Sequence, residues 1–189
     1  MSRLDQLRET MAEEGVDLVA MGPGAHLAWL LDMRPHGDER HLLLCVTQSY
    51  EGFLMPSLEA ESAAQQTDLP FHTWGDADGP DKAFAELLHI SGAMNAKSIV
   101  LDETMRADFA GLVQDALPDA KRQFTATTVG ALRMRKDADE YVKLKRNALS
   151  ADTAMKAAWF AMKPGMTETQ VADIIRDSFA SQDVKPLFA

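Results

Sequence analysis

Short strand-like runs alternate with segments of helical periodicity over the first 130 residues of the chain. The runs are rich in apolar residues and end at Gly, Pro, Asp or other turn-forming residues, which is the pattern expected of strands. They fall at residues 17–21, 41–46, 52–55, 69–74, 98–101 and 122–127. The runs at 41–46 and 52–55 are separated by a short polar segment, so they predict an antiparallel hairpin.

Helices are expected between these runs. Leu4, Leu7 and Met11 recur at helical spacing behind Ser2, a residue type that caps helices, and Gly15 ends the pattern. Further helices are expected at residues 25–31, around residues 84–88, and from a cap at Thr104 to a stop before Pro118. Strands that alternate with helices predict an α/β domain, and the hairpin makes its sheet mixed.

The pattern changes near residue 130. Residues 137–162 contain no Gly or Pro, and apolar residues follow one another there at steps of three and four: Tyr141, Leu144, Ala148, Ala151, Met155, Ala158 and Met162. This spacing predicts one long helix with a single apolar seam. After Pro164 and Gly165, the capping-box spacing of Thr167 and Gln170 predicts a second helix, followed by an extended segment at 184–189. Two such helices cover each other only in part, so the remaining apolar surface requires a sheet or a partner.

Composition narrows the classes of function. The 189 residues are 46% apolar and 25% charged, as in an ordinary globular protein, and the formal net charge of −10 argues against nucleic acid and anionic membranes as partners. No apolar run approaches the roughly 20 residues of a membrane span, so a cytoplasmic protein is expected. Cys45, the single cysteine, cannot form an internal disulfide and is predicted to be a buried strand residue.

Candidate chemistry is densest in residues 36–41, which contain two histidines and two carboxylates. A turn of this kind is usually a solvated, hydrogen-bonded loop, because a short loop rarely preorganises metal ligands. The functional alternative is that His36 donates a hydrogen bond to a substrate carboxylate or carbonyl. His26, His72 and His89 are interpreted as ordinary hydrogen-bonded histidines. The sequence contains no zinc-binding helix motif, phosphate loop or nucleophile elbow.

Three stretches carry a resemblance to a known family. They are AHLAWLLDMR at residues 25–34, ALRMRKDADE at 131–140 and PGMTE at 164–168. In this order and spacing, the chain resembles the creatinase/prolidase/aminopeptidase P family of metallohydrolases. The resemblance implies a mixed-sheet creatinase-like N-terminal α/β domain over residues 1–132. It also implies that residues 133–189 form a hinge and the first two helices of an incomplete pita-bread (α+β) catalytic domain.

The family hydrolyses Xaa-Pro peptide bonds with two divalent metal ions, usually manganese or cobalt, held by two Asp, one His and two Glu. The resemblance places all five ligands beyond Ala189, so no catalytic or metal-binding residue is expected in this chain, and the chain alone is expected to be an inactive fragment. In family dimers the loop that corresponds to residues 33–40 approaches the active site of the neighbouring subunit. We therefore expect a homodimer in which His36, and secondarily Asp38 and Arg34, reach a proline-containing peptide there.

Several alternatives remain open at this point. The parent protein can be a non-peptidase C–N hydrolase of the same family, because fold does not determine substrate. The chain can also be a non-catalytic dimerisation or interaction module that ends at Ala189 and uses its helical seam as an interface. A third alternative is a small-molecule binding domain with a crevice near Gly22, Gly24 and Trp29.

Overall fold

The computed structural model describes residues 1–186. The chain divides into two units, Met1–Arg135, called the α/β unit below, and Lys136–Ala189, called the helical unit. The division falls after Arg135, close to residue 133, where the family resemblance places the start of the hinge. Within the described residues, no helix is long and apolar enough to cross a lipid bilayer.

A mixed sheet forms the centre of the α/β unit, as the sequence predicts. Its strands are β1 (Leu18–Met21), β2 (Leu43–Val46), β3 (Glu51–Pro56), β4 (Phe71–Trp74), β5 (Ser98–Leu101) and β6 (Lys121–Phe124), in the order β4-β3-β2-β1-β5-β6. Strand β2 is antiparallel to both of its neighbours, and every other neighbouring pair is parallel. All strands except β2 therefore end at the same edge of the sheet.

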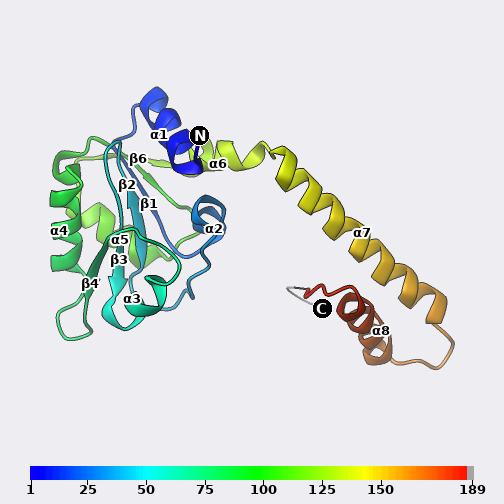
Figure 1. The fold of residues 1–189 in the computed structure, drawn as a ribbon. Coiled ribbons are helices and arrows are strands. Elements are labelled where there is room, and N and C mark those ends of the chain that lie inside the picture. Colours follow the sequence, from blue (N-terminus) through cyan, green and yellow to red (C-terminus); the bar gives the residue numbers. More distant parts are fainter. Residues whose placement is uncertain (187–189) are drawn as a thin grey trace. The chain divides into compact units, whose positions relative to one another are not determined.

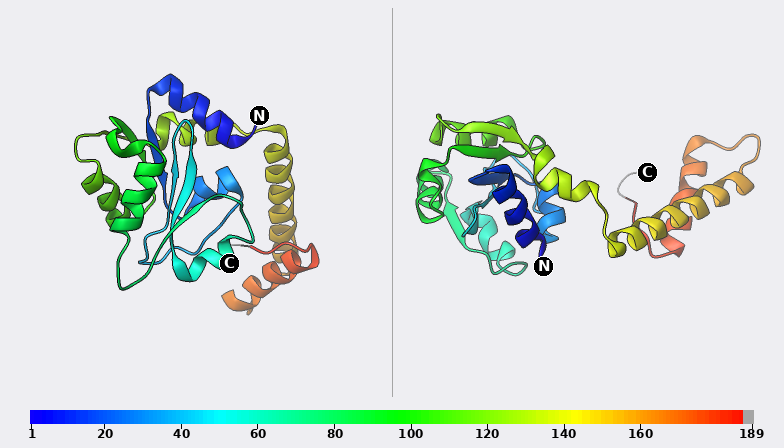
Figure 2. Two further views of the ribbon diagram at one scale, coloured as in Figure 1. Left: turned by 60° about the vertical axis from the view of Figure 1, so that its left-hand side comes forward. Right: turned by 90° about the horizontal axis from the view of Figure 1, so that it is seen from above.

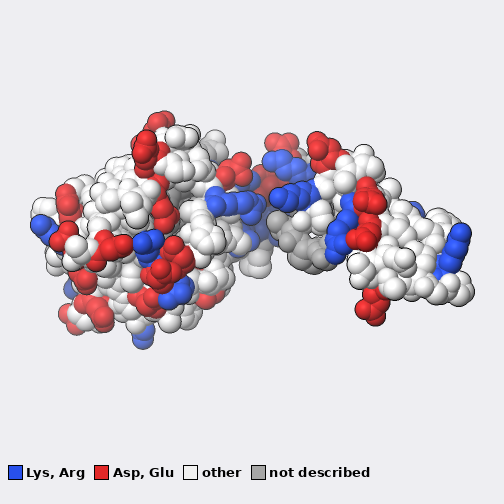
Figure 3. All heavy atoms as spheres, turned by 90° about the horizontal axis from the view of Figure 1, so that it is seen from below, with Lys and Arg blue, Asp and Glu red and all other residues white. Residues whose placement is uncertain are grey.

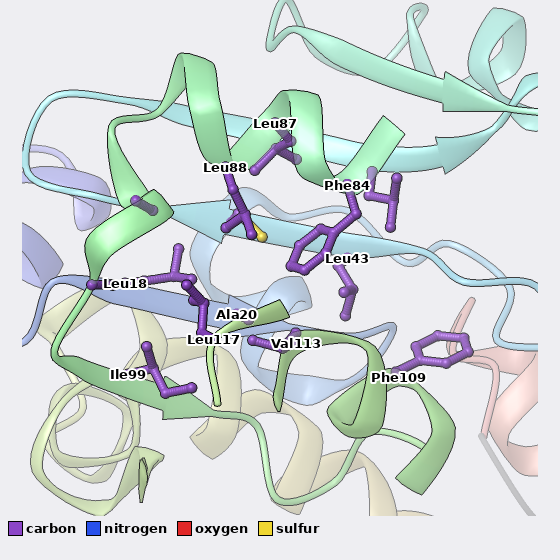
Figure 4. Packing of buried hydrophobic residues seen from close by; sticks show 14 of the residues in the cluster. Leu18, Ala20, Leu43, Phe84, Leu87, Leu88, Ile99, Phe109, Val113 and Leu117 are labelled. Carbon is purple, nitrogen blue, oxygen red and sulfur yellow. The ribbon is translucent and has the colours of Figure 1, made fainter. Parts of the chain in front are cut away.

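Helices cover both faces of this sheet (Figure 1, Figure 2). Leu18 and Ala20 of β1 pack with α4 (Asp81–Ile90) and α5 (Ala107–Ala116), as Figure 4 shows. Val19 and Met21 point to the other face and pack with α1 (Arg3–Glu14), α2 (Ala25–Leu31), α3 (Ser57–Ala63) and α6 (Val129–Met134). Because both faces are buried, the central strands are continuously apolar instead of alternating with polar residues.

Local sequence signals explain several element boundaries. The Ser2 side chain accepts a hydrogen bond from the Asp5 backbone, and Gly15 ends α1 in the left-handed conformation at φ 62°, so both predictions are confirmed. Cys45 is fully buried, and this burial raises the pKa of its thiol to about 12. The thiol is therefore a core group with no free thiolate near neutral pH.

Other boundaries differ from the prediction. Thr104 does not cap α5, because its backbone and hydroxyl both donate to Asp102 Oδ1, at 2.8 and 2.6 Å, and the helix begins only at Ala107. Strand β6 ends at Phe124, and residues Thr125–Thr127 form a 3-10 turn, η2, instead of continuing the strand. A second 3-10 turn, η1 (Ala93–Asn95), precedes β5. The short helices α3 and α6 were not predicted, because seven and six residues are too few to establish a helical period.

The helical unit contains α7 (Ala138–Ala161) and α8 (Glu168–Ser181). Asp137 and Glu140 form a capping box at the start of α7, and Thr167 and Gln170 form the predicted one at the start of α8. The helices pack against each other, and the buried residues of α7 are Ser150, Ala154 and Ala158. Small residues at four-residue spacing allow this close contact.

The face of α7 that α8 covers is not the predicted apolar seam. Of the seam residues, only Ala158 is buried within the described part of the chain, and Tyr141, Leu144 and Met155 are more than half exposed. The expectation that the two helices leave apolar surface uncovered holds, but the contact uses the small residues beside the seam. Residues 184–186 lie outside any helix or strand, and the rest of the predicted extended segment is outside the described residues.

Candidate functional site

The loop between α2 and β2 lies at the edge where the other strands of the sheet end. Strand β2 runs opposite to β1 and β3, so it begins at the edge where they stop. In open α/β sheets, ligands bind outside the carboxyl ends of the strands, where loops supply the side chains. The predicted substrate loop, residues 33–40, is therefore placed at the edge where a ligand site is expected.

A cleft of about 470 Å³ opens between this loop and α3. It is lined by Met33, Arg34, Pro35, His36, Met55, Leu58, Glu59, Ser62, Ala63 and Gln66. Met33, Met55 and Ala63 are buried, whereas Arg34 and His36 are exposed. The left-handed conformation of Asp32, at φ 56°, ends α2 and turns the chain into the loop. An apolar base with a few polar side chains around it is typical of a small-molecule site.

Two of the predicted site residues, Arg34 and His36, have polar side chains without a hydrogen-bond or ion-pair partner in the described structure. By contrast, Arg40 forms a bidentate contact with Asp76 at 2.9 and 3.1 Å, and Arg106 pairs with Asp108 at 3.0 Å. The guanidinium of Arg34 is therefore available to an external carboxylate.

Glu59, on the unpredicted helix α3, supplies an acidic group to the same cleft. Partial burial raises the pKa of its carboxyl, and the nearby Asp38 carboxylate raises it further, against the opposing effect of Arg40 and His36. Sequence reasoning missed Glu59 because it missed α3. No sequence signal pointed to α3: the need for a crossover between β3 and β4 follows from their parallel pairing, which only the structure shows.

Asp38, the third predicted site residue, does not line this cleft. It borders a second hollow of about 260 Å³, together with Pro23, Gly37, Thr104, Met105, Arg106 and Phe109. Its carboxylate accepts a hydrogen bond of 2.8 Å from the Arg40 backbone, which shapes the loop. The predicted residues thus divide between two places, Arg34 and His36 at the cleft and Asp38 at the second hollow. Trp29, near which a ligand crevice is the third alternative, lines neither hollow.

A cluster of polar side chains lies at the same edge of the sheet, in which His26, Asp102 and Thr125 are buried and Glu103 is exposed. His26 follows β1, Asp102 and Glu103 follow β5, and Thr125 follows β6. The Thr125 hydroxyl donates to Glu103 at 2.7 Å and lies 3.3 Å from His26 Nε2. Arg133 of α6 reaches the other ring nitrogen, His26 Nδ1, at 3.0 Å. The interpretation of His26 as a hydrogen-bonded histidine is consistent with this geometry, but its four partners come from distant parts of the chain.

The charges of the cluster act on His26 from two sides. Burial lowers the pKa of the His26 imidazole, and Arg133 lowers it further, whereas Asp102 and Glu103 oppose this shift. Burial also works to raise the pKa of Glu103, but the hydrogen bonds from Thr125 outweigh it and hold that pKa below its ordinary value. His26 is therefore neutral near pH 7, and Glu103 is ionised.

His26, Asp102 and Glu103 lie close enough together to be considered as ligands of one metal ion. Among the residues that the structure describes, they are the one group of at least three His, Cys, Asp or Glu whose ligand atoms lie within 4.8 Å of one another. Arg133 donates to Nδ1, which leaves the imidazole proton on Nε2, the nitrogen that faces the carboxylates. A metal-binding histidine has the opposite arrangement, with its second nitrogen donating to an acceptor. This cluster therefore does not fit a metal ion, and the described residues do not supply a two-metal centre.

The dense loop at residues 36–41 does not gather its histidines and carboxylates either. The His41 ring stacks on Phe109, with ring centroids 4.7 Å apart, and packs edge-on against Trp74. Arg40 is held by Asp76, and His36 lies at the cleft. The charged groups over the visible face of the α/β unit are likewise interspersed, with acidic and basic side chains next to one another (Figure 3).

Comparison with known proteins assigns the chain to a family. The family model of the creatinase/prolidase N-terminal domain matches residues 3–135, which is nearly the whole α/β unit. The chain therefore belongs to the creatinase/prolidase family, through the N-terminal domain of that family. The resemblance found in the sequence is confirmed.

Individual relatives extend the similarity beyond residue 135. The chain is 26% identical over 173 residues to a creatinase from Bacillus sp. (strain B-0618), an alignment that covers 90% of this chain and 42% of that protein. A dipeptidase from Pyrococcus horikoshii OT3 has 26% identity and a TM-score of 0.80 over 95% of this chain and 50% of its own. A prolidase from Thermococcus sibiricus has a TM-score of 0.82 at 20% identity, over 95% of this chain and 49% of its own. The chain thus spans about half the length of these relatives.

Proposed function

We propose that this chain is the N-terminal part of an Xaa-Pro peptidase that works as a cytoplasmic homodimer. The observation that supports the proposal best is the pair of unpartnered side chains, Arg34 and His36, at a cleft in a member of the creatinase/prolidase family. Both lie on the loop that approaches the neighbouring active site in dimers of the family. The role of the chain is then to bind and orient substrate, while hydrolysis takes place on the catalytic domain.

Each loop residue has a specific part in this proposal. Arg34 binds the carboxylate of a proline-containing peptide through two parallel hydrogen bonds, the geometry that a guanidinium provides. His36 donates to a carbonyl or carboxylate oxygen of the same peptide. Asp38 holds the loop in shape through the Arg40 backbone, so it is a positioning residue.

The metal chemistry belongs to residues other than those described. In the proposed enzyme, residues outside the described part of the chain would hold two divalent ions, manganese or cobalt, and these would supply an activated water for hydrolysis of the peptide bond. The described residues do not fit such a centre, because the one candidate cluster is occupied by Arg133. The 189-residue chain by itself is therefore proposed to be inactive.

The direct test is to sequence the encoding DNA past codon 189, then express the complete reading frame and assay it with manganese or cobalt. We expect hydrolysis of Xaa-Pro dipeptides by the complete protein and none by the 189-residue chain. Arg34→Ala should lower kcat/KM about tenfold to a hundredfold, since a hydrogen bond to a charged group is worth roughly 1.5–3 kcal/mol. Arg135→Ala, at an exposed position away from the cleft, is the control and should leave kcat/KM unchanged. A stop codon directly after Ala189, or a complete protein without activity on Xaa-Pro bonds, would overturn the proposal.

Action across the dimer has its own test. A variant of the complete protein that lacks a metal ligand and an Arg34→Ala variant should each have low activity alone. When the two are refolded together, one site in a mixed dimer combines an intact metal centre with an intact Arg34 loop from the neighbour. Activity should then recover to about a quarter of wild type, because half of the dimers are mixed and each has one functional site. No recovery would show that the loop does not act on the neighbouring subunit.

A second candidate function is a non-peptidase C–N hydrolase. It is favoured by the creatinase similarity, which covers 90% of this chain at the same identity as the dipeptidase similarity. The two candidates share the loop and differ in the substrate of the catalytic domain. Turnover of creatine in place of Xaa-Pro dipeptides, in the same preparation, would select this candidate.

A third candidate is a non-catalytic dimerisation module, favoured by the exposed apolar residues of α7. Trp159 and Phe160 are exposed in the helical unit, as are the seam residues Tyr141 and Leu144. Such a surface is typical of an interface. A stable dimer of the 189-residue chain that Trp159→Lys converts to a monomer would support it, whereas a monomer at micromolar concentration would exclude it.

A further inference from the structure

His26 lies between an arginine on one side and two carboxylates on the other. Its Nδ1 is 3.0 Å from Arg133, and its Nε2 is 3.9 Å from Asp102 and 3.8 Å from Glu103. The residue is only 5% exposed, and Asp102 only 2%. A histidine in such a position has two protonation states with different best partners.

The neutral ring fits the observed hydrogen bonds. Arg133 is a donor without acceptor capacity, so Nδ1 must accept, and the ring proton is then on Nε2, next to the Thr125 hydroxyl at 3.3 Å. Each of these groups has a partner in this state. The guanidinium thus ties α6 to the first turn of α2.

The protonated ring does not fit the same arrangement. Both ring nitrogens then carry protons, so Nδ1 no longer accepts from Arg133, and two positive charges face each other. Asp102 offers two oxygens to this state: its Oδ1, which already accepts from Thr104, lies 3.9 Å from Nε2, and its buried Oδ2 has no hydrogen-bond partner in the described structure. An unpaired carboxylate oxygen in the interior is costly, and it gains a donor when the imidazolium turns toward it.

We propose that His26 is a pH-operated latch for α6, which binds Arg133 when it is neutral and releases Arg133 in favour of Asp102 and Glu103 when it is protonated. The proposal is independent of the proposed peptidase function. It assigns a role to the polar cluster around His26, which the substrate loop does not use.

Helix α6 is suited to respond to this contact. It has only six residues, so it depends on docking for its stability. Val129 is fully buried, and Leu132 packs against the same core. A Cβ at Gly130 would lie 2.7 Å from the Thr125 carbonyl oxygen, so glycine permits the close approach of α6 to η2. The last residues of α6, beyond this anchor, include Arg133 and directly precede the division between the two units.

The charged groups around His26 define the pH range. They are Asp102 and Glu103 after β5 and Arg133 on α6, while Arg3 of α1 contacts Trp29 at the other end of α2. Burial and Arg133 place the His26 pKa below its ordinary value of 6.5, and the two carboxylates limit the shift. Since the pKa is lowered in the folded state, the stabilisation is complete above about pH 6.5 and is lost as the pH falls through the folded value.

The test follows His26 and α6 in the full 189-residue chain by NMR and hydrogen exchange. The His26 ring resonances and the Arg133 side-chain resonances should titrate with one shared midpoint below pH 6.5. Over the same range, the amides of Leu132 and Arg135, which bond within the α6 segment, should lose about tenfold or more in protection after correction for intrinsic exchange. Amides of α4 should keep their protection.

Two variants complete the test. His26→Gln retains a polar, non-titrating side chain and should remove the pH dependence of α6 protection. His72→Gln changes another buried histidine, which bonds Tyr50 and has no arginine hydrogen bond among the described residues, and should leave that dependence in place. An Arg133 resonance that does not titrate with His26, or an unchanged pH dependence in His26→Gln, would overturn the proposal. If His26→Gln does not fold, the shared midpoint in the wild-type chain decides.

Discussion

The two units of this chain are built from similar proportions of apolar residues but use them differently. In the α/β unit, large side chains such as Phe53, Phe84 and Phe109 are almost completely buried on the two faces of the sheet. In the helical unit, the buried residues within the described range are Ser150, Ala154 and Ala158, while Trp159 and Phe160 are exposed. Large apolar side chains are thus buried in a core in the α/β unit, whereas those in the described range of the helical unit are partly or fully exposed.

This difference shows why helix formation and core formation are separate questions. Capping boxes at Asp137 and Thr167 define both helices of the helical unit by local hydrogen bonds. Burial of large side chains requires a second layer, which the sheet provides in the α/β unit and which α8 alone does not provide for α7. Secondary structure is therefore equally well determined in both units, but tertiary stability is expected mainly in the first.

The largest difference between the units is expected when the chain is divided after Arg135 and the two pieces are unfolded separately. Residues 1–135 should unfold cooperatively on heating, because they retain both faces of the core. Residues 136–189 should show partial helicity and no cooperative transition, since fewer than 70 residues with so small a buried core rarely fold alone. Circular dichroism of the two pieces measures this. A sharp thermal transition of residues 136–189 as a monomer would contradict the conclusion that the helical unit has too small a core to fold alone.

Two phenylalanines, one in each unit, test the difference in burial between the units. Phe84→Ala should destabilise the chain by about 3–5 kcal/mol, since the residue is 1% exposed, whereas Phe160→Ala, at 82% exposure, should change stability by less than about 0.5 kcal/mol. Denaturant unfolding gives both values. The rate at which a thiol reagent labels the buried Cys45 provides a second readout of opening of the α/β unit. Equal effects of the two substitutions would contradict the assignment of the core.

Helix caps test the comparison at the scale of about 1 kcal/mol, the typical cost of losing a capping side chain. Ser2→Ala should lower the unfolding midpoint of the α/β unit, because α1 is part of its core. Thr167→Ala should reduce the helicity of α8 and leave that midpoint in place. Circular dichroism with parallel Cys45 labelling separates the two outcomes, and a shifted midpoint in Thr167→Ala would indicate that the units unfold together.

The smallest expected effect is at the cleft of the α/β unit. The raised pKa of Glu59 means that its stabilising contribution is present below its unfolded-state pKa and is lost as the pH rises through the folded value. Glu59→Gln should therefore stabilise the chain slightly at pH 7, by about 0.3 kcal/mol because solvent screens a carboxylate that is only partly buried, and have no such effect near pH 4. Thermal unfolding at the two pH values checks this, and destabilisation at pH 7 would argue against it.

Only part of the candidate site was accessible to sequence reasoning. The loop with Arg34 and His36 was identified through the family resemblance, and the structure places both residues at one cleft. Glu59 was missed because α3 is too short for periodicity analysis, and Asp38 was grouped with the other two although it borders a different hollow. The cluster around His26 could not be assembled at all, because its members are up to 107 residues apart in the chain.

The sequence by itself determined the local elements and the family. Apolar runs of a few residues, capping residues and glycines act through neighbours within four positions, so they can be read without knowledge of the fold. Only the tertiary structure decided what those elements bring together. Strand order and direction place the ends of β1, β5 and β6 at one edge, which joins His26 to Asp102, Glu103 and Arg133, and the choice of α7 face is made by the small residues that permit contact. These outcomes depend on non-local packing, which no short segment of sequence encodes.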